Sequence, residues 1–230
     1  YGITISFKDY NIFLGSDPIQ AISLSKWVGF KHFQKLFGSK DFYQALSNTL
    51  IINSLKIFFL FPLPIIMAIL LNELRVRFYK RTVQTLIYVP YFFSWVIVFG
   101  IFYSLLGTYG IVNSLIKSMG GSAISFFGSN TWFRPVLVFT EGWKETGWNT
   151  VIYLAAIAGI DPTLYEAARV DGASRIKQIL HVTLPGLLPT IVLMLIMKVG
   201  YILDTGFEQI LVMYNPTVYK TGDVIQTYVY

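Results

Sequence analysis

The chain has 230 residues, of which 54% are hydrophobic and only 13% are charged, and its mean hydropathy is +0.58. Soluble domains carry about 25% charged residues, so this composition leaves too little polar surface to cover a water-soluble fold and indicates an integral membrane protein. In such a protein the net charge of +6 reports membrane topology rather than nucleic-acid binding, and the absence of cysteine excludes disulfide frameworks, thiolate metal sites and cysteine nucleophiles.

Four apolar segments are long enough to cross a bilayer, which takes about 20 residues of helix. In chain order they cover residues 45–71, 85–106, 136–160 and 184–202. We expect one transmembrane domain over residues 1–230, with an extracytoplasmic lead-in at 1–44 and an extracytoplasmic segment at 204–230. We also expect further spans on both sides, before Tyr1 and after Tyr230.

Basic residues in the connecting loops set the orientation of these spans, because positive charge accumulates on the cytoplasmic side. The loop 72–81 is expected in the cytoplasm because it holds four basic residues, Arg75, Arg77, Lys80 and Arg81. The loop 107–133 contains only Lys117 as a basic residue and is expected outside. The loop 161–183 then returns to the cytoplasm, in agreement with its basic residues Arg169, Arg175 and Lys177.

The polar loop 161–183 has the local signals of two short helices. Asp161 and Pro162 are typical of a helix start, with an N-cap acceptor followed by proline at the first helical position. Gly172 can take the left-handed conformation that ends a helix, and Ser174 can cap a second helix. These residues predict a compact helix–turn–helix beneath the bilayer. An interfacial amphipathic helix anchored to lipid is the alternative interpretation.

The same loop carries a gapped motif. Glu166-Ala167-Ala168, Asp171-Gly172-Ala173 and Leu184-Pro185 resemble, in residues and spacing, the EAA signature of permease subunits in bacterial ABC importers. Ile179 and Val182 replace a phenylalanine and an isoleucine of that signature and stay apolar. Further stretches resemble the sugar-importer branch, which includes the maltose permease subunit, and within it the permeases for alginate-type or pectin-type fragments: 27–37, 42–53 and 147–168.

The resemblance implies an all-α, polytopic transmembrane helical bundle of the type I ABC importer permease kind, located in the bacterial inner membrane. It implies four kinds of partner: a second permease subunit, two copies of a cytoplasmic ATPase subunit, an extracytoplasmic solute-binding protein, and membrane lipid. ATP and Mg would bind the ATPase, since this chain has no GxxxxGK[ST] loop. The chain itself would be neither an enzyme nor a holder of any cofactor.

The EAA loop would act as a coupling helix pair that docks on the ATPase and transmits its closure to the membrane helices. The residues that the motif assigns to this contact are Glu166, Ala167, Ala168, Asp171, Gly172 and Ala173. Glu166 could meet an arginine of the ATPase through a charge-assisted bond; its alternative is a local pair with Arg169 three residues later. Asp171 is also suited to capping the turn.

The substrate pathway is expected between the third and fourth spans. Aromatic rings stack on sugar faces, while amide and charged groups bond hydroxyls or carboxylates. Lys198 lies inside the fourth span, where a charge costs roughly 2.5–3.5 kcal/mol and should face a cavity or a partner. The candidate lining residues are Trp143, Glu145, Trp148, Asn149, Tyr153, Lys198 and Asp204. As alternatives, the two tryptophans are interfacial anchors, Lys144 pairs with Glu141 or Glu145, and Lys198 pairs with an acid of the second permease.

Three other classes of function are compatible with parts of the sequence. An ion-coupled secondary transporter subunit could use Asp204 or Lys198 as an ion site, but that class does not explain the EAA loop. A membrane enzyme would need a catalytic set, yet His32 and His181 are predicted on opposite sides and no acids have catalytic spacing, so no catalytic or metal-binding residues are assigned. A scaffold or channel subunit without ATP coupling is the third. An ATPase subunit that co-purifies through the loop distinguishes the importer from all three.

Overall fold

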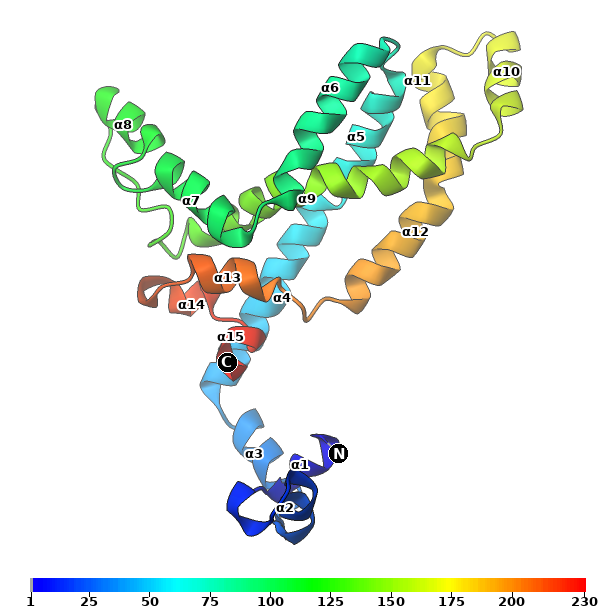
Figure 1. The fold of residues 1–230 in the computed structure, drawn as a ribbon. Helices are drawn as coiled ribbons and strands as arrows, with labels where there is room; N and C mark the ends of the chain where they lie inside the picture. Colours follow the sequence, from blue (N-terminus) through cyan, green and yellow to red (C-terminus); the bar gives the residue numbers. More distant parts are fainter. Residues whose placement is uncertain (1) are drawn as a thin grey trace.

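The structure is a computed structural model that describes residues 2–230. Helices dominate it, as expected for an all-α bundle, and among these residues the strands are limited to a two-residue antiparallel pair, in which Lys8 faces Trp27. This pair lies in a small N-terminal lobe, set apart at one end of the molecule in Figure 1. The lobe comprises α1 (Gly2–Ile5), β1 (Lys8–Asp9), η1 (Ile12–Leu14), α2 (Pro18–Leu24), β2 (Lys26–Trp27) and α3 (Lys31–Phe37).

A nearly continuous helix follows the lobe. It consists of α4 (Lys40–Leu60) and α5 (Pro62–Glu73), separated only by Phe61. Pro62 is tolerated there because the first turn of a helix leaves its N–H groups unbonded in any case. With 34 residues and high hydropathy, the combined helix is long and apolar enough to cross a membrane, and it contains the expected span 45–71.

The second expected span, 85–106, is not a single helix. It is divided between α6 (Arg77–Tyr88) and α7 (Trp95–Leu106), with the 3-10 turn η2 (Val89–Phe92) and the extended Phe93 between them. Pro90 is the second residue of this turn, and Ser94 caps α7 through its hydroxyl, which accepts the Ile97 N–H at 3.4 Å. Figure 1 shows the two helices forming a V. The hydropathy pattern detected the apolar run but not the break, because a proline near a span is compatible with both a continuous and a broken helix.

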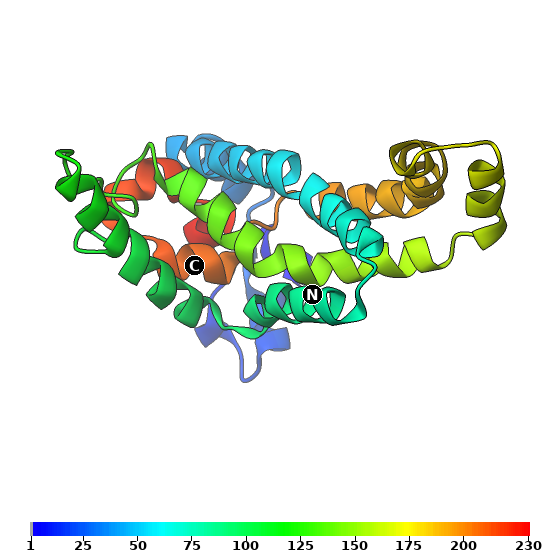
Figure 2. The same cartoon turned by 90° about the horizontal axis from the view of Figure 1, so that it is seen from above.

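Helix α8 (Ile111–Ser118) continues from α7, and together they form a second apolar stretch, Trp95–Ser118, long enough to span. The long helix α9 (Phe133–Ala158) then crosses the centre of the molecule, as Figure 2 shows from above. It packs most extensively on α5 and also on α4 and α6. At Gly147 the approach to α6 is so close that a Cβ atom would lie 1.8 Å from the carbonyl oxygen of Ile87.

The chain bends by 69° between α9 and α10 (Pro162–Val170). After α10 a turn leads into α11 (Arg175–Gln178), the π-helical turn η3 (Ile179–Thr183) and α12 (Leu184–Gly200), which run on without a break. The fourth expected span, 184–202, is therefore the later part of a longer helix. Leu184 N–H donates to the carbonyl of Ile179, five residues earlier, so the helix widens just before Pro185, which has no N–H to donate.

The last segment folds back against α4, α7 and α9. It contains α13 (Phe207–Met213), η4 (Pro216–Val218), α14 (Tyr219–Gly222) and α15 (Ile225–Val229). The Asn48 side-chain amide on α4 donates to the carbonyls of Lys220 and Asp223 at 3.2 and 2.8 Å. The main apolar core joins this segment to α4, α7 and α9 through Ile52, Val98, Phe102, Phe133, Leu137, Ile210 and Met213.

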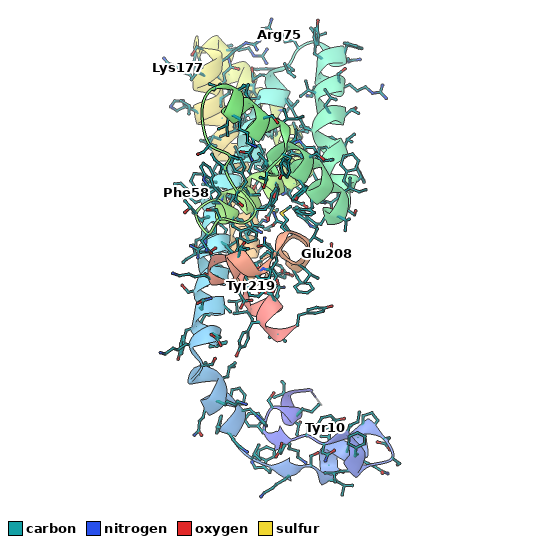
Figure 3. All side chains as sticks on the ribbon, turned by 90° about the vertical axis from the view of Figure 1, so that its left-hand side faces the viewer. Tyr10, Phe58, Arg75, Lys177, Glu208 and Tyr219 are labelled. Carbon is teal, nitrogen blue, oxygen red and sulfur yellow. The ribbon has the colours of Figure 1, made fainter. Side chains whose placement is uncertain are left out.

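The two basic loops lie at the same end of the molecule. Figure 3 labels Arg75, between α5 and α6, and Lys177, on α11, near one extremity, with Tyr10 of the N-terminal lobe at the other. In the described part of the chain, three helices are long and apolar enough to cross a membrane, and a fourth is if the bent pair α9–α10 is counted as one span. A shared end for both basic loops agrees with the orientation predicted from their charges.

Candidate functional site: a polar cavity and a projecting loop

A cavity of about 410 Å³ lies between α4, α9, α12 and the chain just after α12. Its floor along α9 is formed by side chains spaced four residues apart, namely Glu141, Glu145, Asn149 and Tyr153. Residues at this interval share one face of an α-helix, so a single polar stripe of α9 faces the cavity. Among residues 2–230, no group of three or more His, Asp and Glu side chains is placed to hold a metal ion.

A buried lysine at the edge of the cavity ties three segments together. The Lys56 ammonium of α4 forms an ion pair with Glu141 of α9 and donates to the carbonyl of Thr205 at 2.7 Å and to Gln209 Oε1 at 2.9 Å. The side chains of Lys56 and Glu141 are only 7% and 14% exposed. A buried charge needs this degree of pairing and hydrogen bonding to offset its desolvation.

A second lysine lies behind the cavity wall. Lys144 Nζ donates to the carbonyl of Tyr91 at 2.8 Å, in the break between α6 and α7, and contacts Glu145 Oε1 at 3.3 Å. The ammonium also lies over the rings of Tyr91 and Trp95, 4.8 and 5.4 Å from their centres. Lys144 therefore satisfies a carbonyl that the broken helix leaves free, and it compensates the Glu145 charge at the cavity.

Two other charged residues reach the cavity from α12 and the chain that follows it. Lys198 and Asp204 both line it, and both are exposed. Asp204 Oδ1 accepts the Gly206 N–H at 3.1 Å and the Gln226 amide at 3.0 Å. Gly206 has φ +74°, a left-handed conformation that favours glycine. This turn fixes Asp204 at the cavity mouth.

Five of the seven side chains expected on the pathway thus meet at one cavity: Glu145, Asn149, Tyr153, Lys198 and Asp204. Trp143 and Trp148 do not line it. Trp148 stacks on Tyr91 with ring centres 4.6 Å apart, and Trp143 meets the ring of Phe102 edge-on at 5.4 Å. Their large apolar rings are used to pack α9 against η2 and α7, which sequence spacing alone did not indicate.

The sequence reasoning missed the role of the first span. Asn53 and Lys56 on α4 line the cavity together with Glu141, and the Asn53 amide donates to the carbonyl of Ile202 at 2.6 Å. A lysine inside an apolar span was the available signal, since an intramembrane charge marks a cavity or a partner. Its partner is Glu141, 85 positions later in the chain (141 − 56), and no local pattern reveals such a pairing.

The loop between α9 and α12 has the predicted capping residues. Asp161 accepts the Thr163 N–H at 2.9 Å at the start of α10, Ser174 accepts the Lys177 N–H at 3.5 Å, and Gly172 has φ +71°. These three local predictions are confirmed. The hydrogen bond from Thr163 lowers the pKa of the Asp161 carboxyl, because it stabilises the charged form.

Most of this loop is exposed at an extremity of the molecule, as Figures 1 and 2 show for α10. Glu166 and Asp171 are exposed, and neither takes part in an ion pair within residues 2–230, so the expected local alternative, a pair between Glu166 and Arg169, is not formed. Val170 and Ile176 expose 88% and 70% of their surface. Exposed apolar side chains that gather at a surface mark a candidate site for binding another protein.

Two contacts connect the loop to the rest of the bundle. Arg175 Nη1 lies 3.0 Å from Glu73 Oε2 at the end of α5. The Tyr165 hydroxyl on α10 is hydrogen-bonded to the Thr183 hydroxyl, 2.9 Å away in the π-helical turn. These contacts join α11 to the end of α5 and α10 to the base of α12.

A helical membrane protein with a polar cavity between its spans and a projecting helix–turn–helix at one end has the architecture of a transport subunit. The family described as "Binding-protein-dependent transport system inner membrane component" matches residues 61–230. The chain belongs to this family, and it is therefore a multi-pass permease component of a binding-protein-dependent ABC importer in the bacterial inner membrane, as the EAA motif predicted.

Known proteins resemble the chain along most of its length. It is 46% identical to the polygalacturonan/rhamnogalacturonan transport system permease protein YteP of Bacillus subtilis (strain 168), over all of this chain and 70% of that protein. A crystal structure of a bacterial ABC transporter involved in the import of the acidic polysaccharide alginate matches with a TM-score of 0.85 and 44% identity, covering 89% of this chain and 72% of that one. The bacterial alginate ABC transporter in complex with an alginate pentasaccharide-bound periplasmic protein matches with a TM-score of 0.84 and 44% identity, covering 88% and 70%.

Proposed function

We propose that this permease admits an oligosaccharide or polysaccharide fragment through the cavity between α4, α9 and α12. The lining supports this proposal because it combines what a sugar requires: hydroxyl-bonding groups on Asn149, Glu145 and Asp204, and aromatic surface on Tyr153 and Trp95. A volume of about 410 Å³ suits a short saccharide segment rather than a whole polymer. The relatives named above transport pectin-type or alginate polysaccharides.

The loop 161–183 is proposed to dock on a cytoplasmic ATPase subunit, with Glu166, Ala167, Ala168, Asp171, Gly172 and Ala173 at the contact. The observation that carries this proposal is a capped loop that projects from the bundle and presents exposed apolar residues beside a carboxylate with no ion pair in residues 2–230. A charge-assisted bond from an ATPase arginine to Glu166 would contribute roughly 1.5–3 kcal/mol. ATP and Mg would bind that subunit, present in two copies, and the chain would have no catalytic role of its own.

The remaining partners follow from the same arrangement. A second permease subunit would complete the pathway, since Lys198 and much of α12 are exposed in this chain alone. An extracytoplasmic solute-binding protein would deliver the substrate at the end opposite the loop. The other interpretation of the loop, anchoring to lipid, predicts that α10 lies on the membrane surface instead of in a protein groove.

The absence of cysteine from the chain permits a direct test by site-specific cross-linking. A single cysteine at Glu166 should cross-link to the ATPase subunit in the assembled complex, whereas a cysteine at the exposed Tyr109, at the far end of α7, should not. Glu166→Lys and Gly172→Pro should abolish uptake while leaving membrane insertion intact. Equal cross-linking at both positions, or normal coupling of ATP hydrolysis to uptake in either variant, would overturn the docking proposal.

A further inference from the structure

The cations around the cavity differ in whether their charge is already compensated. Lys56 is paired with Glu141, and Lys144 with Glu145. Both lysines also donate to backbone carbonyls, and both are buried. Their ammonium groups are therefore occupied by the protein and present little net charge to a substrate.

Lys198 is the exception. The ion pairs found within residues 2–230 are those of Lys56, Lys144 and Arg175, and no acceptor in the described part of the chain bonds Lys198 Nζ. It lies in an apolar helix, α12, where an uncompensated charge is costly. Met194 and Tyr201, four residues before and three after, line the same cavity, so the face of α12 that carries Lys198 is turned toward it.

The groups opposite Lys198 are suited to hydroxyls. The Asn149 side-chain amide lines the cavity and has no hydrogen-bond partner among residues 2–230. Asp204 uses Oδ1 for Gly206 and Gln226, which leaves Oδ2 able to accept a hydroxyl. Among residues 2–230, the cavity therefore offers one free cation and several neutral or anionic acceptors, instead of a uniformly positive wall.

We propose that Lys198 is a specificity-determining residue that selects saccharides bearing a carboxylate, such as uronic acids, and binds one carboxylate at a time. This inference rests on the proposed function. A free ammonium forms a charge-assisted hydrogen bond with an anionic group that enters the cavity. A single cation, in place of a cluster, also allows release, because a transport site must bind strongly enough to admit its substrate and weakly enough to let it leave.

The test uses the complete importer, reconstituted with its binding protein in liposomes, and compares uptake of a uronate trisaccharide with that of a neutral trisaccharide of equal length. Lys198→Gln should reduce kcat/KM for uronate uptake by about 10- to 100-fold, the range expected when a charge-assisted bond is lost. Neutral uptake should change by less than about threefold, since hydroxyl contacts remain. Lys198→Arg should retain most uronate uptake, and Lys117→Gln, a lysine of the outer loop on α8, is the matched control.

Equal losses of uronate and neutral uptake in Lys198→Gln, or no loss of either, would overturn the selection of carboxylates while leaving the importer function in place. Failure of Lys198→Gln to assemble with the second permease, measured by co-purification, would also overturn it, because Lys198 would then be paired with an acid of that subunit. The wild-type importer in liposomes could also take up neither saccharide, although the binding protein stimulates its ATP hydrolysis. That result would refute the proposed substrate class and this inference with it.

Discussion

The ion pair between Lys56 and Glu141 gives the sharpest prediction about how the cavity is held together. Lys56→Met keeps the length and the apolar stem of the side chain but removes the ammonium. It leaves the Glu141 carboxylate buried and unpaired, and it leaves the Thr205 carbonyl and Gln209 Oε1 without their donor. Removing one partner of a buried pair typically costs about 3–5 kcal/mol.

For a chain of this size, about 1 kcal/mol corresponds to roughly 2–4 °C in Tm, so Lys56→Met should melt roughly 6–20 °C below the wild type. The measurement is the fraction of assembled complex that survives heating, followed by size-exclusion chromatography in detergent. Lys40→Met is the matched control, because Lys40 is exposed at the start of the same helix, and its Tm should stay within about 2 °C of the wild type.

The double variant Lys56→Met, Glu141→Gln separates the effect of an unpaired buried charge from the effect of the altered side-chain shape. It removes both charges, so no buried carboxylate is left unpaired, and it should recover at least half of the lost Tm. Uptake by the double variant should remain low if the pair also shapes the cavity. A Lys56→Met complex as stable as the wild type, or a double variant no more stable than the single one, would refute the reasoning that the buried pair holds α4, α9 and the chain after α12 together.

Two further predictions concern helix packing and coupling. Gly147→Ala should lower the Tm of the complex by several degrees, since the added methyl would clash with the Ile87 carbonyl and overpacking costs about 1–3 kcal/mol. Gly100→Ala is the control and should leave Tm unchanged, because nothing lies within 4 Å of the added methyl. An equal change of Tm in the two variants would contradict the close contact of α6 and α9. Charge reversal at Arg175 or Glu73 should leave Tm unchanged, because an exposed pair contributes only about 0–1 kcal/mol. The same variants should lower uptake per ATP hydrolysed by roughly twofold to fivefold, and exchanging both charges should restore it. A double variant that stays impaired would show that this contact does not transmit motion.

The local features of this protein were predictable because local interactions determine them. The cap at Asp161, the left-handed Gly172 and the cap at Ser174 each depend on residues at most a few positions apart. The membrane class followed from composition, since a chain so poor in charge cannot cover itself with polar surface. The family followed from the EAA motif, because its residues and spacing can be read from the sequence without the tertiary structure.

The cavity, in contrast, was decided by the tertiary structure. Trp143 and Trp148 were predicted from the sequence as pathway residues, but they pack against Phe102 and Tyr91 and do not line the cavity, whereas Lys56, from a different span, lines it. Which face of a membrane helix points inward depends on neighbours that are distant in the chain, and the bilayer gives no simple inside–outside pattern to reveal it. The break between α6 and α7 likewise depends on a distant residue, because Lys144 of α9 satisfies the free carbonyl of Tyr91.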